Sequence, residues 1–278
     1  MSDGVDFQRR FAGVSRLYGQ SGLTKLQAAH VVVVGIGGVG SWAAEALARN
    51  AVGAITLVDL DNIAESNVNR QIHALDGNFG KAKITAMRER IFSINPACVV
   101  REIEDFVTLE NASKLLNFDF DVLLDCIDDA QAKAALAATS KNVQSPIIMS
   151  GSAGGRLDPT RIKVVDLSAV TNDKLLAKVR NILRRDYQFP KASNTKKSAK
   201  FNVACVYSDE PVLTPNTVET NAIIGDDALR ASTNAAAGDT KNPRAITGIN
   251  CAGYGSSVCV TAPMGCAVAQ LAINLIVS

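Results

Sequence analysis

Apolar runs alternate with amphipathic segments along the first 150 residues of the chain. The run His30–Val34 is apolar and borders a glycine-rich turn, which is typical of a buried parallel strand. Strands are predicted at His30–Val34, Ala54–Asp59, Val99–Glu104, Asp121–Asp125 and Pro146–Ser150, and helices at Ser41–Asn50, Lys81–Ile94, Leu109–Leu116 and Ala130–Asn142. Strands that alternate with helices predict an α/β fold with a Rossmann-like, doubly wound and mostly parallel sheet.

The two flanking regions depart from this alternation. Apolar residues between arginines in the first 30 residues predict a short amphipathic helix. After about Ser152 the pattern changes. A helix is predicted at Asn172–Asp186 and a strand at Val203–Tyr207. The segment that follows shows neither the helical period nor the alternation of a strand. We therefore expect a helical segment at 1–30, a Rossmann-like domain at 31–160, and a C-terminal part at 161–278 with a long loop near 209–247.

Composition narrows the class of protein. The chain has 278 residues, of which 47% are hydrophobic and 20% charged, and these values exclude global disorder. The 29 basic residues against 27 acidic ones exclude a uniformly basic nucleic-acid coat protein, but they leave room for local patches. None of the six cysteines forms a C-x-x-C pair, which disfavours a structural zinc site. The N-terminus carries no secretory pattern, so we predict a cytoplasmic location.

The C-terminal stretch leaves two interpretations open. No charged residue follows Arg244, and the apolar part Met264–Val277 is interrupted by Gln270 and Asn274 at helical spacing. A membrane span needs about 20 apolar residues. We therefore predict a buried core helix and no stable membrane association. The alternative is a membrane anchor, if the native C-terminus continues.

A glycine-rich turn follows the first predicted strand. Gly35, Gly37, Gly38 and Gly40 fit the pattern G-x-G-G-x-G and lead directly into a helix, whose N-terminus offers unpaired N–H groups to phosphates. Asp59, at the end of the second strand, is suited to accept ribose hydroxyl groups. These features predict a nucleotide site. The same two features also occur in NAD-dependent oxidoreductases, so that class of enzyme is an alternative.

The residues beyond the second strand favour a triphosphate over a dinucleotide. Arg70 and Lys83 can neutralise phosphate oxygens and the charge that develops as pyrophosphate leaves. Asp128, just beyond the fourth strand, can hold Mg²⁺ bridging the phosphates. The alternative is that Arg70 and Lys83 are ordinary solvated surface residues.

Five motifs together resemble those of the ubiquitin-activating-enzyme-like ATPases of the ThiF and MoeB type. They are the glycine turn, Asp59-Leu60-Asp61, Asn67-x-Asn69-Arg70-Gln71, Lys81-x-Lys83 and Asp125-Cys126-Ile127-Asp128-Asp129. The resemblance implies a homodimer that adenylates a carboxylate with ATP and Mg²⁺, and a sheet completed by the C-terminal part. It assigns Asp59 to the ribose, Asn69, Arg70 and Lys83 to the phosphates, and Asp128 to the metal. Asp61 and Asn67 belong to the same nucleotide-binding motifs. Arg16 would reach into the partner's site, with a structural salt bridge as the alternative.

A closer resemblance is to the TcdA-type (CsdL) tRNA threonylcarbamoyladenosine dehydratases. It extends through Gly151–Thr160, Cys205–Ser208 and Asn250–Gly255. It implies ATP-dependent activation of the threonyl carboxylate on the modified adenosine beside the tRNA anticodon, followed by ring closure, and a sulfur-transfer protein of the cysteine desulfurase system as a partner. The domain at 31–160 would bind ATP and the part at 161–278 would face the tRNA. The alternatives are an activator of a ubiquitin-like sulfur carrier, disfavoured by the missing C-x-x-C pairs, and a non-catalytic scaffold.

The thiols and His73 carry less specific signals. Cys251 matches a family cysteine in a position comparable to the thioester cysteine, so it is either a nucleophilic or sulfur-handling thiol or a buried group that shapes the site. Cys126 is expected to be inert core, and Cys205, Cys259 and Cys266 to serve packing. His73 is expected to make a structural hydrogen bond.

A basic segment offers a surface for RNA. Between Lys174 and Lys200 there are nine basic residues and one acid, Asp186. Phosphates would supply most of the affinity of such a segment, and Tyr187 and Phe189 could either stack on bases or anchor the end of the helix. The residues predicted to bind tRNA are Lys191, Lys196, Lys197 and Lys200. The alternative is a solvated basic loop without a partner.

Overall fold

A computed structural model describes residues 6–191, 199–213 and 254–278, and within them one seven-stranded sheet organises the chain. The strand order is β3-β2-β1-β4-β5-β7-β6, and all neighbours are parallel except the antiparallel pair β6 and β7. The strands are β1 (His30–Val34), β2 (Ala54–Val58), β3 (Val99–Ile103), β4 (Val122–Asp125), β5 (Ile147–Ser150), β6 (Ile162–Asp166) and β7 (Ala204–Ser208). This arrangement confirms the predicted α/β class with a mostly parallel sheet.

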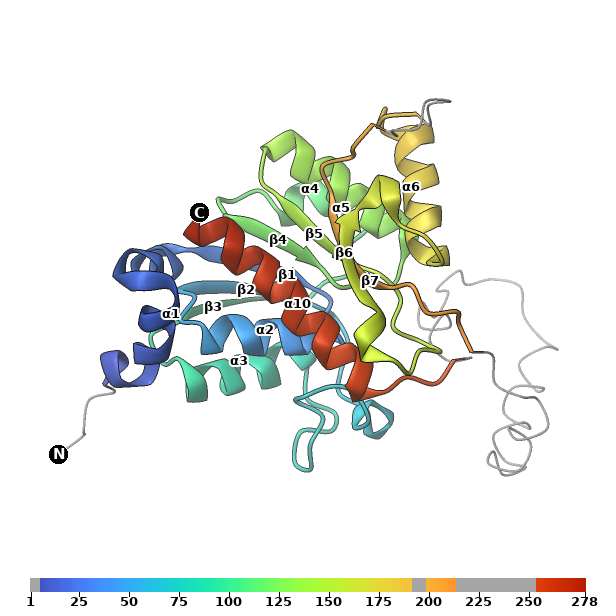
Figure 1. The fold of residues 1–278 in the computed structure, drawn as a ribbon. Coiled ribbons are helices and arrows are strands. Elements are labelled where there is room, and N and C mark those ends of the chain that lie inside the picture. Colours follow the sequence, from blue (N-terminus) through green and yellow to red (C-terminus); the bar gives the residue numbers. More distant parts are fainter. Residues whose placement is uncertain (1–5, 192–198, 214–253) are drawn as a thin grey trace, which may run out of the picture.

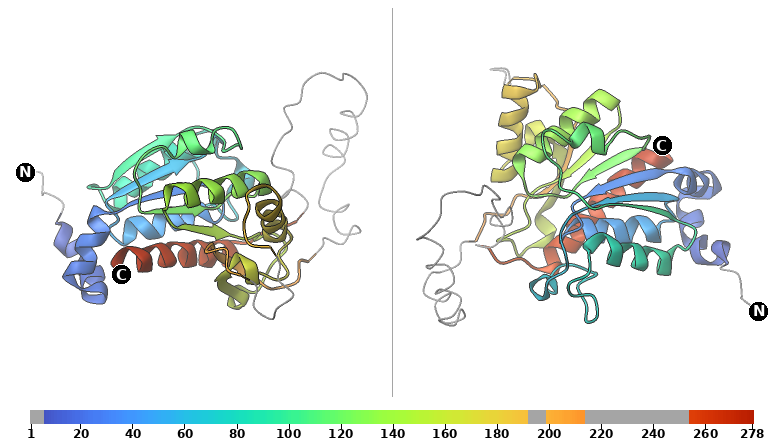
Figure 2. Two further views of the ribbon diagram at one scale, coloured as in Figure 1. Left: turned by 90° about the horizontal axis from the view of Figure 1, so that it is seen from above. Right: turned by 180° about the vertical axis from the view of Figure 1, so that it is seen from behind.

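Helices cover both faces of the sheet (Figures 1 and 2). On one side lie α2, α3 and α10, and on the other α4, α5 and α6, while α1 packs at the end where the parallel strands begin. The helices are α1 (Phe7–Ala28), α2 (Gly40–Arg49), α3 (Lys83–Ile94), α4 (Ala112–Leu115), α5 (Ala130–Val143), α6 (Lys174–Asp186) and α10 (Val258–Val277), with 3₁₀ turns η1 (Glu65–Asn67), η2 (Pro159–Arg161) and η3 (Leu167–Ala169).

The strand β1 shows how the sequence builds two cores from one sheet. Val31 and Val33 belong to the core beneath α2, α3 and α10, while Val32 and Val34 belong to the core beneath α5 and α6. Successive side chains of a strand point to opposite faces, so a strand buried on both faces is apolar throughout. The uninterrupted valine run therefore specifies a central strand.

The predicted strands and helices of the first 150 residues are confirmed, with shifts of three residues or fewer at their ends. The helical segment α1 is longer than the short helix predicted, since it spans 22 residues, and it is kinked at Gly19, whose φ of 75° and ψ of 168° are not helical. The strand β6 (Ile162–Asp166) was missed. It lies at the edge of the sheet, is only partly buried and carries Lys163 and Asp166, so its apolar pattern is weak.

The C-terminal apolar stretch forms a helix that packs on the sheet. The predicted core helix at Met264–Val277 starts earlier, at Val258, and packs against α2, α1 and the strands β4, β5 and β7. Gly265 allows this close packing, since a Cβ there would lie 2.5 Å from the carbonyl oxygen of Val39. The helix is also long and apolar enough to cross a membrane, and 44% of its apolar window is buried inside the protein. The predicted absence of stable membrane association therefore stays a prediction, and a membrane anchor stays its alternative.

Candidate functional site

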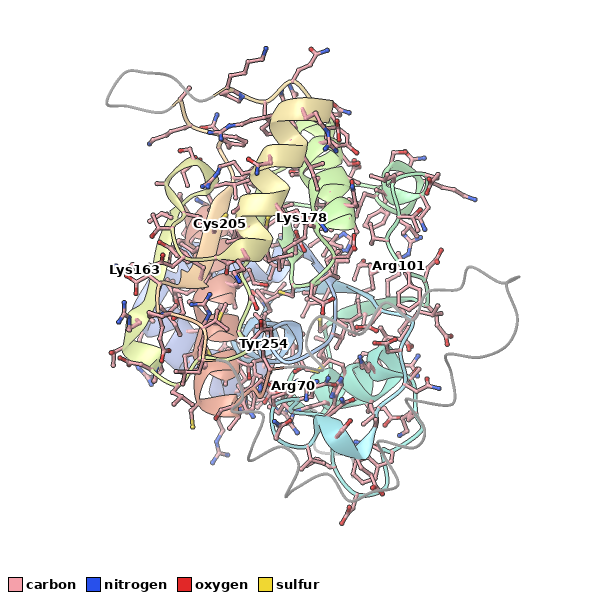
Figure 3. The ribbon with its side chains drawn as sticks, turned by 90° about the vertical axis from the view of Figure 1, so that its right-hand side faces the viewer. Arg70, Arg101, Lys163, Lys178, Cys205 and Tyr254 are labelled. Atoms are coloured by element: carbon pink, nitrogen blue, oxygen red, sulfur yellow. The ribbon has the colours of Figure 1, made fainter. Side chains whose placement is uncertain are left out.

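A cavity of about 620 Å³ lies where the parallel strands β1, β2, β4 and β5 end. Figure 3 looks onto this edge of the sheet, with Arg70 and Tyr254 near its centre and Lys178 of α6 above them. Nine of the predicted nucleotide residues line the cavity: Gly35, Gly37, Gly38, Asp59, Asp61, Asn67, Arg70, Lys83 and Asp128. Ligands of open α/β sheets bind outside the carboxyl ends of the strands. The structure thus gathers motifs that are almost 100 residues apart.

The glycine turn is shaped by close approaches. Gly35 has a φ of 85°, and a Cβ there would lie 2.8 Å from Ile127 Cγ2. A Cβ at Gly40 would lie 1.8 Å from the carbonyl oxygen of Gly35, so only glycine lets α2 begin this close to the turn. Gly40 itself does not line the cavity. Val39 provides no side-chain cap, and the N–H of Ser41 donates to the carbonyl oxygen of Gly37 at 3.1 Å, so the other amides at the N-terminus of α2 are suited to a phosphate.

Asp59 holds the glycine turn against the end of β2. Its Oδ2 accepts the N–H of Ile36 at 2.6 Å and its Oδ1 accepts the N–H of Asp61 at 2.9 Å. Burial raises the pKa of Asp59, and the nearby ammonium of Lys83 opposes this shift. A carboxylate has further acceptor sites, so the two backbone bonds leave capacity for ribose hydroxyl groups.

Two cations face the cavity. Lys83, the first residue of α3, is 7% exposed, and its Nζ lies 2.7 Å from Asp61 Oδ2 and 3.9 Å from Asp59 Oδ1. Arg70 donates from Nη1 to the carbonyl oxygen of Ser66 at 2.9 Å and to Asn69 Oδ1 at 3.0 Å. A buried ammonium and an oriented guanidinium on one wall are suited to phosphate oxygens. Lys83 is therefore not the solvated surface residue of the alternative interpretation, and Arg70 is partly buried.

The two predicted asparagines serve the loop that carries Arg70. Asn67 lines the cavity, and its Oδ1 accepts the N–H of Ala64 at 3.0 Å. Asn69 does not line the cavity, and its Nδ2 donates to the carbonyl oxygen of Ser256 at 2.7 Å. Asn69 thus ties the loop to the segment that precedes α10.

The backbone of Arg70 is clamped between α2 and α10. The indole Nε1 of Trp42 donates to the Arg70 carbonyl at 3.0 Å, and Thr261 Oγ1 reaches the same oxygen at 3.5 Å. The N–H of Val258 donates to the carbonyl of Asn69 at 3.1 Å. The C-terminal helix therefore helps to fix the position of a predicted phosphate ligand.

Asp128 lies exposed at the cavity, three residues beyond the end of β4. In the part of the chain that the structure describes, no cluster of three His, Cys, Asp or Glu side chains could enclose a metal. Mg²⁺ bound to a nucleotide needs no such cluster, because one or two carboxylates, phosphate oxygens and water complete its octahedral shell. Asp128 thus fits the part of a single magnesium ligand beside a triphosphate.

Other lining residues were missed by the sequence analysis. Gln71 follows Arg70 in the motif and is 5% exposed, and its Oε1 has no hydrogen-bond partner among the described residues. The loop after β3 contributes the apolar Phe106, Val107 and Leu109. Its position beyond the end of a parallel strand is the signal that could have identified it.

Several predicted residues lie elsewhere. Arg16 is exposed on α1 and does not line the cavity. Lys191 and Lys200 are exposed, away from the cavity wall. Cys251, Lys196 and Lys197 lie outside the described residues.

Some basic side chains of α6 make hydrogen bonds within the fold. Arg180 donates to the carbonyl oxygens of Leu167 and Val170, Arg184 donates to that of Pro190, and Arg185 pairs with Asp186. Phe189 is buried and stacks on Phe201, so of the two roles considered for it the anchoring role is correct. Lys174 and Lys178 remain exposed, and the intervening Leu175 lines the cavity. The helix therefore begins beside the cavity, and neither of these lysines lines the cavity itself.

The cysteines fall into two groups. Cys98 and Cys205 are buried, and burial raises the pKa of both thiols. Cys126 follows β4, is only partly buried and lines the cavity, so its predicted place in the core is wrong. Burial raises its pKa to about 12, which agrees with an unreactive thiol. Cys259 and Cys266 are exposed on α10, so the expectation that they pack inside is wrong for both. They occupy the side of α10 that faces away from the sheet.

A second cavity, of about 680 Å³, lies between α1, α2 and α3. It is bordered by Arg10, Arg49, Arg90 and His73 and contains none of the predicted nucleotide residues. Burial, with a contribution from the charge of Lys83, lowers the pKa of His73 to about 4. The imidazole is therefore neutral near pH 7 and is a poor counter-ion for phosphate. Neither ring nitrogen has a hydrogen-bond partner among the described residues, so the structure does not contain the expected structural hydrogen bond.

Comparisons with known proteins agree with this geometry. The family model that matches is that of the ThiF family, over residues 7–278. A tRNA threonylcarbamoyladenosine dehydratase of Escherichia coli K12 is 42% identical over 260 residues, covering 93% of this chain and 90% of that protein. The protein of that name in Haemophilus influenzae is 45% identical over 214 residues, covering 77% of this chain and 80% of that protein. The crystal structure of the E. coli enzyme in complex with ATP matches with a TM-score of 0.81 at 38% identity, covering 98% of this chain and 96% of that one.

Similarity to sulfur-carrier activators is shorter. An adenylyltransferase and sulfurtransferase of Drosophila willistoni is 32% identical over 136 residues, covering 49% of this chain and 29% of that protein. The similarity to the dehydratases thus extends through the C-terminal part, whereas the similarity to this relative covers half of the chain.

Proposed function

The chain belongs to the ThiF family, and we propose that it is an ATP-dependent tRNA threonylcarbamoyladenosine dehydratase that acts beside the anticodon. The observation that carries the proposal is the cavity at the ends of β1, β2, β4 and β5, which joins an anion-binding glycine turn, two cations and the exposed carboxylate of Asp128. The similarity to named dehydratases over more than nine-tenths of the chain supports the identity of the substrate.

The chemistry explains why such a site is needed. A carboxylate is a poor electrophile, so its oxygen first attacks the α-phosphorus of ATP, and pyrophosphate leaves. A nitrogen of the same side chain then attacks the acyl carbon, the ring closes, and AMP leaves with the former carboxylate oxygen. The nitrogen gives up its proton, and the modified nucleoside has lost one water. Because both ends belong to one side chain, the second step is effectively unimolecular.

The cavity residues divide this work. The glycine turn and the N-terminus of α2 hold the phosphates, and Asp59 accepts the ribose hydroxyl groups. Arg70 and Lys83 offset the charge that develops on the departing pyrophosphate. Mg²⁺, when bound, would neutralise phosphate oxygens, with Asp128 as its protein ligand. Phe106, Val107 and Leu109 offer an apolar wall for the base.

The assembly and the location of the protein belong to the same proposal. We place Arg16 of each protomer of a homodimer in the partner's site, and the 72% exposed Leu17 beside it supports a contact that covers this helix. The cytoplasmic location follows from the proposed tRNA substrate. A nucleophilic or sulfur-handling role for Cys251 and a sulfur-transfer partner are supported by the family resemblance alone.

The tRNA surface in this proposal follows α6. Lys174 and Lys178 are exposed next to the cavity, and Lys191 and Lys200 are exposed beyond the end of the helix. Lys196 and Lys197 belong to the same stretch of sequence. Phosphates of the anticodon arm would contact these lysines while the modified base enters the cavity.

The test is to incubate the protein with ATP, Mg²⁺ and tRNA that carries threonylcarbamoyladenosine. Mass spectrometry of the digested nucleosides should show the loss of one water, with one AMP formed per nucleoside converted. Lys83→Met should lower the rate by a factor on the order of 10² to 10³, because a charge that stabilises the transition state is lost. Lys81→Met is the matched control, since Lys81 pairs with Glu89 outside the cavity.

Two results would contradict the proposal. Intact threonylcarbamoyladenosine in every ATP-containing reaction would exclude the dehydratase. Pyrophosphate exchange that requires the C-terminal glycine of a carrier protein, and no tRNA, would favour the sulfur-carrier activator instead.

A further inference from the structure

A fully buried ion pair lies under the floor of the nucleotide cavity. The side chains of Asp125 and Lys133 are both 0% exposed, and Lys133 Nζ lies 2.8 Å from Asp125 Oδ1 and 3.4 Å from the Asp125 carbonyl oxygen. Lysine and aspartate are almost never fully buried unless they are paired. A well-packed apolar pair in such a position is often as stable or more stable. Net stability is therefore a weak reason for this pair.

The pair closes a loop whose residues form one wall of the cavity. Asp125 is the last residue of β4, and Lys133 lies in the first turns of α5. Between them the residues Cys126, Ile127, Asp128, Asp129, Gln131 and Ala132 all line the cavity. Lys133 thus joins the two ends of the segment that carries the proposed magnesium ligand.

The first part of this loop is braced independently of Lys133. The N–H of Cys126 donates to the carbonyl oxygen of Val34 at 2.8 Å, and Ile127 packs against Gly35. The N–H of Ile127 also donates to Asp125 Oδ1 at 3.3 Å. Cys126 and Ile127 are therefore held by β1 and the glycine turn.

The second part depends on how α5 is anchored. Asp129 caps α5, because its Oδ1 accepts the N–H of Ala132 at 2.8 Å, and the N–H of Lys133 donates to the Asp129 carbonyl at 3.0 Å. These bonds join Asp129 to the helix but not to the sheet. Ala130 and Ala134 pack α5 against apolar side chains of the sheet, and the Lys133–Asp125 pair adds the direct polar connection to the end of β4. Asp128 lies between the braced part and the helix.

We propose that Lys133 is a positioning residue that sets the place of Asp128 by tying the start of α5 to the end of β4. The inference rests on the proposed role of Asp128 as the protein ligand of nucleotide-bound Mg²⁺. Lys133 touches no nucleotide itself, so its loss should weaken the contribution of the metal while metal-free ATP still binds.

The test uses a double variant that removes both charges together. In Asp125→Asn/Lys133→Met the asparagine oxygen can still accept the N–H of Ile127, and no unpaired charge is buried. Trp42, the single tryptophan of the chain, donates to the Arg70 carbonyl, so its fluorescence can report nucleotide binding. ATP affinity is measured with and without Mg²⁺, and chemical denaturation checks the fold. Lys114→Met, on the exposed surface of α4, is the control.

The double variant should bind metal-free ATP within about threefold of the unmodified protein. The gain in ATP affinity from Mg²⁺ should fall about tenfold, and the Mg²⁺ concentration that gives half of the maximal AMP formation should rise by a similar factor. An unchanged gain from Mg²⁺ in a folded double variant would overturn the proposal. If the unmodified protein formed no AMP, the proposed function would fail, while the two affinities would still decide the role of Lys133.

Discussion

Three polar residues at or near the cavity make hydrogen bonds to the backbone of its loops: Asp59, Asn67 and Asn69. Asp59 accepts the N–H of Ile36, Asn67 accepts that of Ala64, and Asn69 donates to Ser256. These bonds hold the loops before any nucleotide arrives, so part of the ordering cost of binding is already met in the folded protein. A substitution at these positions is therefore expected to alter both loop geometry and nucleotide affinity.

His73 makes the stability of the protein depend on pH. Burial lowers its pKa to about 4 in the folded chain, while an unfolded chain has a histidine pKa near 6.5. Between these values the unfolded state binds a proton that the folded state does not, so the free energy of unfolding falls as the pH drops from 6.5 towards 4. The contribution lost is on the order of 3 kcal/mol.

Urea denaturation between pH 7.5 and 4.5 measures this effect. In His73→Gln, which cannot take up the proton, the decline in the free energy of unfolding over this range should be shallower by about that amount. The same decline in the variant and in the unmodified protein would show that other groups cause it.

At the level of elements, the crossing of α10 and α2 links the C-terminal helix to the cavity. Gly265 lies against the start of α2, where a Cβ would be 2.5 Å from the Val39 carbonyl oxygen and 2.7 Å from Trp42 Cβ. The same two helices hold the Arg70 carbonyl through Trp42 and Thr261. A change in their spacing should therefore reach the phosphate-binding side of the cavity.

Two glycine-to-alanine substitutions have opposite expected effects on stability, one at this crossing and one in the exposed part of α1. Gly265→Ala should destabilise the protein by about 1–3 kcal/mol, because the added methyl group overpacks a helix crossing. Gly13→Ala, where a Cβ meets nothing within 4 Å in α1, should stabilise it by up to about 1 kcal/mol. Thermal unfolding measures both effects. Unchanged stability in Gly265→Ala would mean that the two helices move apart at no measurable cost.

At the scale of the whole molecule, the near-neutral total charge conceals an uneven distribution. The basic residues of α6 stand beside the cavity, and only Asp186 among the acids lies on that helix. Arg180 and Arg184 donate to backbone carbonyl groups of the fold, and Arg185 pairs with the neighbouring Asp186. Lys174 and Lys178 stay exposed on the same helix, and Figure 3 shows Lys178 above Arg70 and Tyr254. Any RNA bound there would be held by a few flexible lysines, and its affinity should depend strongly on salt.

Charge reversal at Lys178 tests this surface. Lys178→Glu should lower tRNA affinity about three- to tenfold at moderate salt and make the slope of log affinity against log salt shallower by about 1. ATP affinity should stay unchanged, because Lys178 does not line the cavity. Lys114→Glu makes the same charge change on α4 and should leave tRNA binding as it was. Equal effects of both variants would point to the overall charge of the protein instead of to α6.

The sequence by itself determined the class of fold and most of the nucleotide motifs. The valine run of β1, the glycine turn and Asp59 each have a local physical cause: burial on both faces, close backbone approach, and a place at the end of a strand. Such causes act over a few residues, so pattern and spacing express them. The strand β6 escaped because a half-exposed edge strand needs no regular apolar pattern.

Only the tertiary structure decided which of these residues share one cavity. Three features depend on how the elements pack together. They are the packing of α10 on the loop around Arg70, the place of the loop with Phe106 in the cavity wall, and the buried pair of Asp125 and Lys133. It also separated the arginines of α6 that serve the fold from the lysines that face solvent, since a basic residue has the same charge in either role. Burial and hydrogen-bond geometry, which arise only in the folded chain, make that distinction.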